Sequence, residues 1–206
     1  MQKIMMVFIF LFTGIATVYA QDDTPHKNES VIKIAQLTQN AKLTDLIESP
    51  DAKWIAFVKK SNYTIPSNCF YFSEKGEQAD EIWIANTKET TKKLLVAPHF
   101  SCKDVSKVII DPHNLQFSPD SKTLYFETSA WVTSGAIHAV DVDGNHLRFV
   151  TDGSELRVVQ SGRYKGNIIA NQHRYRFKGN TPLGSYDWDW LFTPTGKRIK
   201  LYKKMD

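Results

Sequence analysis

A phrase of nine residues that occurs twice in this chain restricts its fold more than any other feature. Residues 49–57 read SPDAKWIAF, and residues 118–126 read SPDSKTLYF. A third, weaker copy at residues 161–169, SGRYKGNII, keeps the serine, the lysine and the apolar end but lacks the proline and the aspartate. Self-similarity at a spacing of tens of residues is typical of folds built from repeated supersecondary units. The chain is therefore predicted to be a repeat protein.

The copied phrase has a local physical meaning. Proline presets φ at the first central position of a type I turn, and the aspartate after it suits the second position and bonds back to the backbone. An apolar run rich in aromatic and β-branched residues follows, which is typical of a strand. Each copy is thus predicted to be a turn that leads into a strand.

Two more strands joined by a turn follow each copy. The predicted third strands are residues 81–86, 136–142 and 185–192. Their turns are residues 87–91, 143–144 and 194–196. The predicted fourth strands are residues 92–96, 147–151 and 197–202. No helix of any length is predicted, so the chain is expected to be all-β, with four-stranded antiparallel units.

Residues 138–153, HAVDVDGNHLRFVTDG, look at first like part of a calcium loop. An EF-hand needs oxygen ligands at alternate positions and a glycine at the sixth, whereas Gly144 directly follows Asp143 and lies only three places after Asp141. Asp-Gly between two alternating segments instead predicts a tight β-hairpin.

The second unit carries a family resemblance. FSPD at residues 117–120, TLYF at 123–126, AVDVDGN at 139–145 and LRFVTDG at 147–153 resemble the TolB-type, WD40-like propeller repeat. The resemblance is strong over the second unit, good over the first apart from an insertion, and weak over the third. It implies propeller blades, an exported location and a protein-binding role, and it carries no catalytic residues. The predicted blades are about residues 41–98, 105–154 and 155–204.

Three blades make only half of a propeller. Closed propellers use about four to eight blades, so a three-blade chain leaves open sheet faces and edges. A symmetric homodimer would complete a ring of six blades, because two-fold assemblies bury the same patch twice. The alternative is that residues 31–44 fold across the open side of a monomer.

The N-terminus reads as a secretory signal. Lys3 precedes an apolar run over residues 4–19, and Val18 and Ala20 are the small residues that signal peptidase prefers. No later stretch is apolar enough to hold the chain in a bilayer. A soluble protein of the bacterial periplasm, or a secreted one, is therefore expected. The predicted organisation is a signal peptide at residues 1–20, a polar and mostly disordered leader at 21–40, and a propeller domain at 41–206.

Two cysteines fall in the exported part. Cys69 lies in a long insertion, residues 62–79, and Cys102 lies between the first and second units. An oxidising compartment favours a structural disulfide between them over two free thiols. Long loops often bind something. The aromatic residues of the insertion, Tyr63, Phe70 and Tyr71, are therefore candidates for a partner surface.

The most unusual segment is SYDWDWLF at residues 185–192. As a strand it places Tyr186, Trp188, Trp190 and Phe192 on one face, and Asp187 and Asp189 on the other. The aromatic residues could be a sugar-stacking platform and the carboxylates an acid–base pair. The favoured interpretation is packing for the aromatic residues and a structural or exposed role for the acids.

The preceding strand could supply partners for these acids. It carries His173, Arg174 and Arg176, and either arginine could pair with Asp187 or Asp189 across the strands. His173 and Arg174 complete the predicted partner surface.

No motif for catalysis or cofactor binding is present. The six histidines are dispersed without metal-ligand spacing, and there is no G-x-S-x-G elbow or glycine-rich phosphate loop. The excess of basic residues is scattered, which argues against nucleic-acid binding. No catalytic residue, metal or cofactor is therefore expected. The favoured function is an exported, non-enzymatic binding protein that acts through an unidentified protein partner. The alternatives are a carbohydrate- or cell-wall-binding protein that uses Tyr186, Trp188 and Trp190, and an inhibitor or immunity protein against a secreted enzyme.

Overall fold

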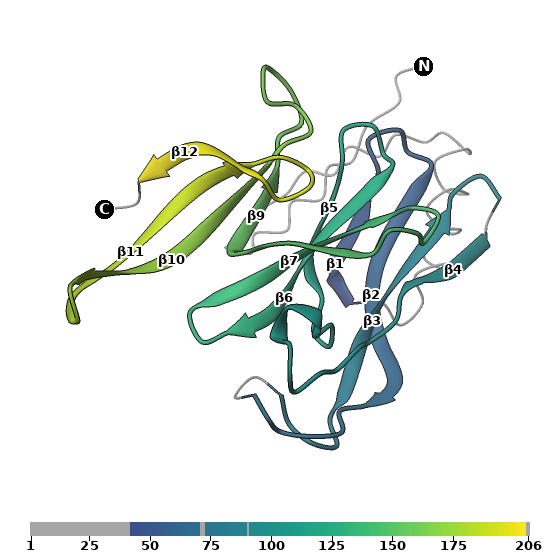
Figure 1. The fold of residues 1–206 in the computed structure, drawn as a ribbon. Coiled ribbons are helices and arrows are strands. Elements are labelled where there is room, and N and C mark those ends of the chain that lie inside the picture. Colours follow the sequence, from purple (N-terminus) through teal and green to yellow (C-terminus); the bar gives the residue numbers. More distant parts are fainter. Residues whose placement is uncertain (1–41, 71–72, 90, 205–206) are drawn as a thin grey trace, which may run out of the picture.

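The computed structural model describes residues 42–70, 73–89 and 91–204, which form three four-stranded antiparallel sheets (Figure 1). The first sheet contains β1 (Lys42–Glu48), β2 (Trp54–Thr64), β3 (Gln78–Asn86) and β4 (Thr91–Val96). The second contains β5 (His113–Phe117), β6 (Thr123–Trp131), β7 (Ser134–Asp141) and β8 (Arg148–Asp152). The third contains β9 (Ser154–Val158), β10 (Ile168–Lys178), β11 (Thr181–Phe192) and β12 (Arg198–Lys204).

The predicted all-β class and the three four-stranded units are confirmed. Each sheet has its strands in sequence order. Within the described ranges the one helical element is a 3-10 turn, Val105–Lys107, in the connection between the first and second sheets. No helix in this part of the chain is long and apolar enough to cross a membrane. The predicted signal peptide and polar leader lie outside the described residues.

The SPD turn of the second sheet is held by its own side chains. The Ser118 hydroxyl donates to Oδ1 of Asp120 at 2.6 Å and accepts from the backbone N–H of Thr123 at 2.9 Å. The Ser118 N–H donates to the Thr123 carbonyl at 2.8 Å, which closes the turn onto the start of β6. Ser121 takes the left-handed conformation inside the turn, with φ of 61°. The predicted turn that leads into a strand is therefore present.

The first sheet repeats this turn. The Ser49 hydroxyl donates to Oδ1 of Asp51 at 2.8 Å and accepts from the Trp54 N–H at 3.0 Å. Ala52 takes the left-handed conformation there, with φ of 56°. The same sequence thus gives the same hydrogen bonds in two blades.

The third copy forms a different and longer loop. The closing backbone pair is Val159 N–H to the Asn167 carbonyl, at 2.9 Å, and Ile168 occupies the strand position that Leu124 has in the second sheet. The predicted alignment of Ser161 with Ser118 was therefore wrong. This loop lacks the proline and the aspartate, and the chain reverses direction through Gly162 and Gly166, which are both at positive φ.

Apolar side chains between the sheets form the core. One cluster joins the first two sheets, with Val58 and Ile84 packed among Phe117 and Phe126. A second joins the second and third sheets, with Tyr125 and the residues Ile137, Leu156 and Ile168. The sheets therefore pack face to face in chain order, as propeller blades do.

The outward face of the first sheet is also buried. Because side chains alternate along a strand, the neighbours of the inward-facing residues of β2 and β3 point away from the second sheet. These neighbours, Ile55, Phe57 and Ala85, are 0–1% exposed and pack with Leu46 and Trp83 of their own sheet. This face is not an open apolar surface.

The long insertion is shorter than predicted. β2 continues to Thr64 and β3 begins at Gln78, so the connecting loop is residues 65–77. Cys69 and Cys102 form a disulfide with a Cα–Cα distance of 5.8 Å, as predicted. The bond ties this loop to the chain that leaves the first sheet.

Candidate interaction surface

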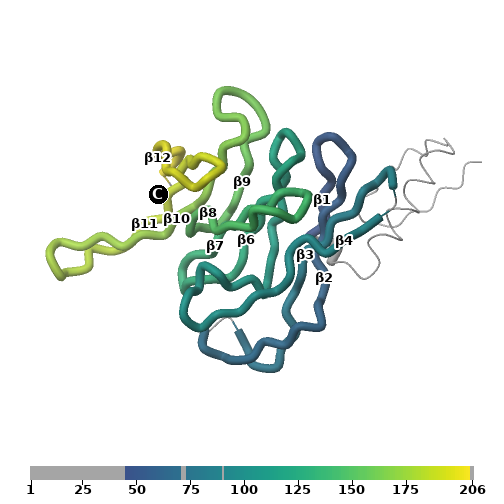
Figure 2. The backbone as a smooth tube through the Cα atoms, turned by 45° about the vertical axis from the view of Figure 1, so that its right-hand side comes forward, coloured from purple at the N-terminus to yellow at the C-terminus, as the bar shows by residue number. Residues whose placement is uncertain are grey.

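The hairpin of β10 and β11 projects beyond the rest of the third sheet (Figures 1 and 2). β9 pairs with β10 only as far as Asn171, and β12 pairs with β11 only as far as Trp188. Among the described residues, residues 173–187 therefore pair only with one another. We call these residues the arm.

The arm exposes large apolar side chains. Tyr175 is 59% exposed, and Phe177 and Leu183 are each 60% exposed. An isolated two-stranded hairpin is marginally stable in water, and a soluble protein gains nothing in stability by presenting such residues to solvent. Sequence reasoning missed these three residues, although a strand run longer than its neighbours was a signal for a projecting hairpin.

The aromatic residues of β11 lie in a row on one face, as predicted. The ring centroids of Tyr186 and Trp188 are 4.1 Å apart, and those of Trp188 and Trp190 are 6.2 Å apart. Alternation along the strand places these rings on the face that points toward the second sheet, where Trp190 joins the core between the sheets. Trp190 thus packs against the core, Trp188 lies next to it, and Tyr186 lies within the arm.

Cationic side chains lie over these rings. Arg176 lies 5.1 Å from the Tyr186 centroid, Lys204 lies 5.3 Å from that of Trp188, and Arg198 lies 4.4 Å from that of Trp190. Each contact is a cation–π interaction between neighbouring strands. A sugar needs a bare ring face for stacking, so these cations disfavour a sugar-stacking platform.

The carboxylates lie on the opposite face and are neutralised by partners. Asp189 is 2% exposed, forms an ion pair with Arg157 and accepts from Asn171 Nδ2 at 3.1 Å. Asp187 contacts Nδ1 of His173 at 2.8 Å. Two carboxylates that are each committed to a separate partner do not form an acid–base pair.

The predicted pairing of Arg174 or Arg176 with these aspartates was wrong. In the strand register Arg174 lies opposite Tyr186, which places both arginines on the aromatic face. Arg174 instead forms a salt bridge with Asp152 of β8, with 2.7 Å between Nη1 and Oδ2. His173, and not an arginine, is the partner of Asp187.

The base of the arm is fixed to the second sheet. Gln172 is 1% exposed and donates to the carbonyl of Asp152 at 2.9 Å, and its Oε1 accepts from Arg198 at 2.8 Å. The salt bridge of Arg174 reaches the same aspartate. This network holds the arm at a defined angle to the second blade.

The candidate residues of the insertion that the structure describes are half-buried, unlike the exposed side chains of the arm. Tyr63 and Phe70 pack against a small buried cluster under the loop, and Phe70 contacts Phe100 edge-on with 6.1 Å between ring centroids. Tyr71 lies outside the described residues. The structure does not bring the insertion and the arm together into one surface.

Within the part of the chain that the structure describes, no three His, Cys, Asp or Glu side chains gather as a metal site. The expected absence of a metal and a cofactor stays a prediction.

Three antiparallel four-stranded sheets packed face to face define a partial β-propeller. No protein-family profile and no curated protein matches this chain. Solved structures with a similar fold include the propeller domain of the trilobed protease from Pyrococcus furiosus, at 15% identity and a TM-score of 0.48, covering 81% of this chain and 44% of that one.

Two further structures are of this kind. A TolB protein from Agrobacterium tumefaciens is 15% identical, with a TM-score of 0.46, and the match covers 80% of this chain and 50% of that one. An acylaminoacyl peptidase from Pyrococcus horikoshii is 17% identical, with a TM-score of 0.49, and the match covers 81% of this chain and 26% of that one. The chain thus spans half or less of the length of these proteins, and the likeness concerns the fold.

Proposed function

We propose that this protein is an exported, non-enzymatic propeller-type binding protein that docks an acidic protein surface with its arm. The observation that carries the proposal is the exposure of Tyr175, Phe177 and Leu183 on a hairpin that is fixed at its base. Surfaces with several exposed large apolar residues are typical of contacts between proteins.

The charge of the arm gives the chemistry of the partner. It carries three cationic side chains, Arg174, Arg176 and Lys178, against the single carboxylate of Asp187. Lys203 and Lys204 lie on the neighbouring end of β12. A partner with an apolar centre and an acidic rim would complement this surface and associate faster at low salt.

The non-enzymatic role rests on the commitment of the acidic groups near the arm. Asp189 and Asp187 each have a separate partner, and the aromatic rings are covered by cations. Export is supported by the predicted signal peptide and by the disulfide, because structural disulfides persist in oxidising compartments.

Site-specific photo-crosslinking in the native host tests the proposal. A photoreactive residue at Phe177 should give one discrete adduct, whereas the same residue at Val132, which is 79% exposed at the β6–β7 turn, should give none. The adduct is identified, and the purified partner is titrated with the protein.

The purified pair then gives quantitative outcomes. Arg176→Ala with Lys178→Ala should weaken binding by about tenfold or more, and added salt should weaken the unsubstituted pair. Equal adducts at Phe177 and Val132, no adduct at Phe177, or unchanged affinity of the double variant contradicts the arm as the docking element.

The carbohydrate-binding alternative has a direct test. A glycan array probed with the protein should show no binding that Trp188→Ala abolishes, because Lys204 and Arg176 already occupy the faces of that ring. Glycan binding that disappears in a folded Trp188→Ala variant would favour the alternative.

A further inference from the structure

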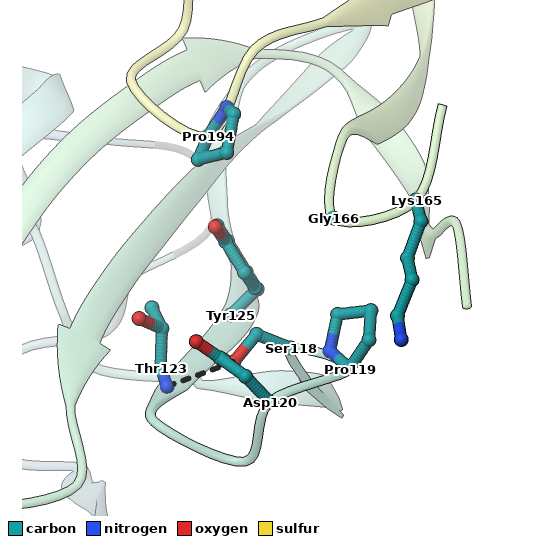
Figure 3. A pocket seen from close by; sticks show the side chains of 8 residues that line it. All are labelled: Ser118, Pro119, Asp120, Thr123, Tyr125, Lys165, Gly166 and Pro194. Atoms are coloured by element: carbon teal, nitrogen blue, oxygen red, sulfur yellow. Dashed lines mark hydrogen bonds between the residues drawn. The ribbon is translucent and has the colours of Figure 1, made fainter. Parts of the chain in front are cut away.

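A cavity of about 340 Å³ lies between the second and third sheets. Its walls come from the SPD turn of the second sheet, the loop before β10 and the turn between β11 and β12. Figure 3 shows the Tyr125 hydroxyl pointing into this space below Pro194, with Asp120 and Lys165 on either side of Pro119. The volume is at the small end of the range for ligand sites.

The cavity exists because the third blade lost the repeated turn. Between the first two blades, the Asp51 N–H donates to the Ser121 hydroxyl at 3.1 Å, so one SPD turn closes against the next. The third blade has no such turn: its longer loop closes between Val159 and Asn167. The position of Tyr125 is also occupied by the small residue Ala56 in the first blade.

Tyr125 brings an unpartnered donor into the cavity. The side chain is 2% exposed and its ring packs in the core between the second and third sheets. Its hydroxyl lines the cavity and makes no hydrogen bond to any residue that the structure describes. Burial raises the pKa of Tyr125, so the hydroxyl keeps its proton. The oxygen is open to the cavity, so the hydroxyl can hydrogen-bond with a polar group of a ligand.

Two charged groups complete the walls. Asp120 accepts from the Ser118 hydroxyl at 2.6 Å and from the Lys122 N–H at 3.3 Å, and both bonds go to Oδ1, which leaves Oδ2 able to accept. The bond from Ser118 lowers the pKa of Asp120, so the group is ionised. Lys165 is exposed and forms no salt bridge with a described residue. One wall is thus anionic and the other cationic.

We propose that this cavity binds a small zwitterion with its ammonium and its carboxylate at opposite ends, of which a dipeptide is the simplest case. The carboxylate accepts from the Lys165 ammonium, and the ammonium donates to Asp120 Oδ2 and to the oxygen of the Tyr125 hydroxyl, which lies on the side of Asp120 (Figure 3). The body of the ligand packs on the ring faces of Pro119 and Pro194. The inference does not depend on the arm, which uses a different part of the third sheet.

The probe is the dipeptide alanyl-alanine, titrated into the full chain by calorimetry or NMR. We expect saturable binding, and at least tenfold weaker binding of N-acetyl-alanyl-alanine and of alanyl-alanine amide, each of which lacks one terminal charge. Glucose, an uncharged polyol, should not saturate. Absence of saturation by about 10 mM dipeptide, equal binding of the capped analogues, or saturation by glucose alone overturns the proposal.

Three variants locate the binding. Tyr125→Phe removes one oxygen and should weaken dipeptide binding about tenfold, with no loss in the free energy of unfolding, because the hydroxyl has no described partner. Lys165→Gln should have a similar effect, and Lys178→Gln, at the end of the arm, should have none. Binding that is unchanged in both Tyr125→Phe and Lys165→Gln contradicts this site.

Discussion

At the scale of single residues, the SPD turn depends on the hydroxyl of its serine. Ser118 donates through its hydroxyl to one partner and accepts from a backbone N–H through the same oxygen, so one atom holds both ends of the turn. The turn positions the first residue of β6. Substitution of this serine therefore loosens the entry to a central strand.

Ser118→Ala should lower the free energy of unfolding by about 1–2 kcal/mol, because the Thr123 N–H loses its acceptor. Urea denaturation measures the change. Ser161→Ala is the matched control, since Ser161 is exposed and lies in the third copy, whose loop closes without it. Equal losses in both variants would mean that the third serine has the same role after all.

His138 makes stability depend on pH. It is 2% exposed, stacks on Phe126 and contacts the Thr128 hydroxyl at 3.2 Å. Burial lowers the pKa of His138 from 6.5 to about 4, so the folded protein holds it uncharged. Between these two values the unfolded chain binds a proton at this residue that the folded chain does not.

The free energy of unfolding should therefore fall by up to about 3 kcal/mol as the pH drops from 6.5 to 4. Urea denaturation across this range measures the slope. His138→Phe keeps an aromatic ring against Phe126 and should flatten the slope in this window. An NMR titration that places the His138 pKa above 6 would contradict the argument.

At the scale of elements, the turn between β11 and β12 sets how closely the third blade approaches the second. Gly196 has φ of +86°, and a Cβ built on it would lie 1.9 Å from the carbonyl oxygen of Val150 in β8. No side chain fits there without moving one sheet from the other. The glycine therefore marks a close approach between these two blades.

Gly196→Ala should destabilise the protein clearly more than Gly144→Ala, which loses about 1–2 kcal/mol from the left-handed conformation alone. Gly144 has a similar φ of +95° and nothing within 4 Å of its Cβ position, so it separates conformational strain from collision. Thermal or urea denaturation of both variants gives the comparison. Equal losses would show that the contact with Val150 yields easily.

The sequence predicted the elements whose cause is local. The SPD turns follow from a proline, an aspartate and a serine within a few residues, and the hairpin at Asp143-Gly144 follows from its dipeptide. The face of each residue in β11 follows from alternation. These features need no knowledge of the rest of the chain.

The partners that come from another sheet could not be predicted. Arg174 reaches Asp152 because β8 passes under the base of the arm, and no spacing in the sequence reports that. The cavity at Tyr125 depends on a loop of the third blade that departs from the repeat. Such contacts depend on how the blades are placed, which a local pattern does not encode.

At the scale of the whole molecule, blade count and burial point to different assemblies. The count of three predicts a homodimer, because an open half-ring leaves apolar faces to cover. The outward face of the first sheet, however, has Ile55 and Phe57 only 1% exposed. Little apolar area is left on that face for a second copy to bury.

We therefore expect the purified protein to have the mass of one chain in solution. Light scattering after size-exclusion chromatography, at several concentrations, measures it. A mass of two chains that persists on dilution would support the six-blade ring.

The position of the disulfide in the sequence has a consequence for the order in which the blades can fold. Cys69 and Cys102 are 33 residues apart, and Cys102 comes after β4 and before β5. In a chain that is exported from its N-terminus, both cysteines cross the membrane before any strand of the second sheet follows. The disulfide can form while the rest of such a chain is still crossing the membrane. The later blades then pack on a first blade that is already cross-linked.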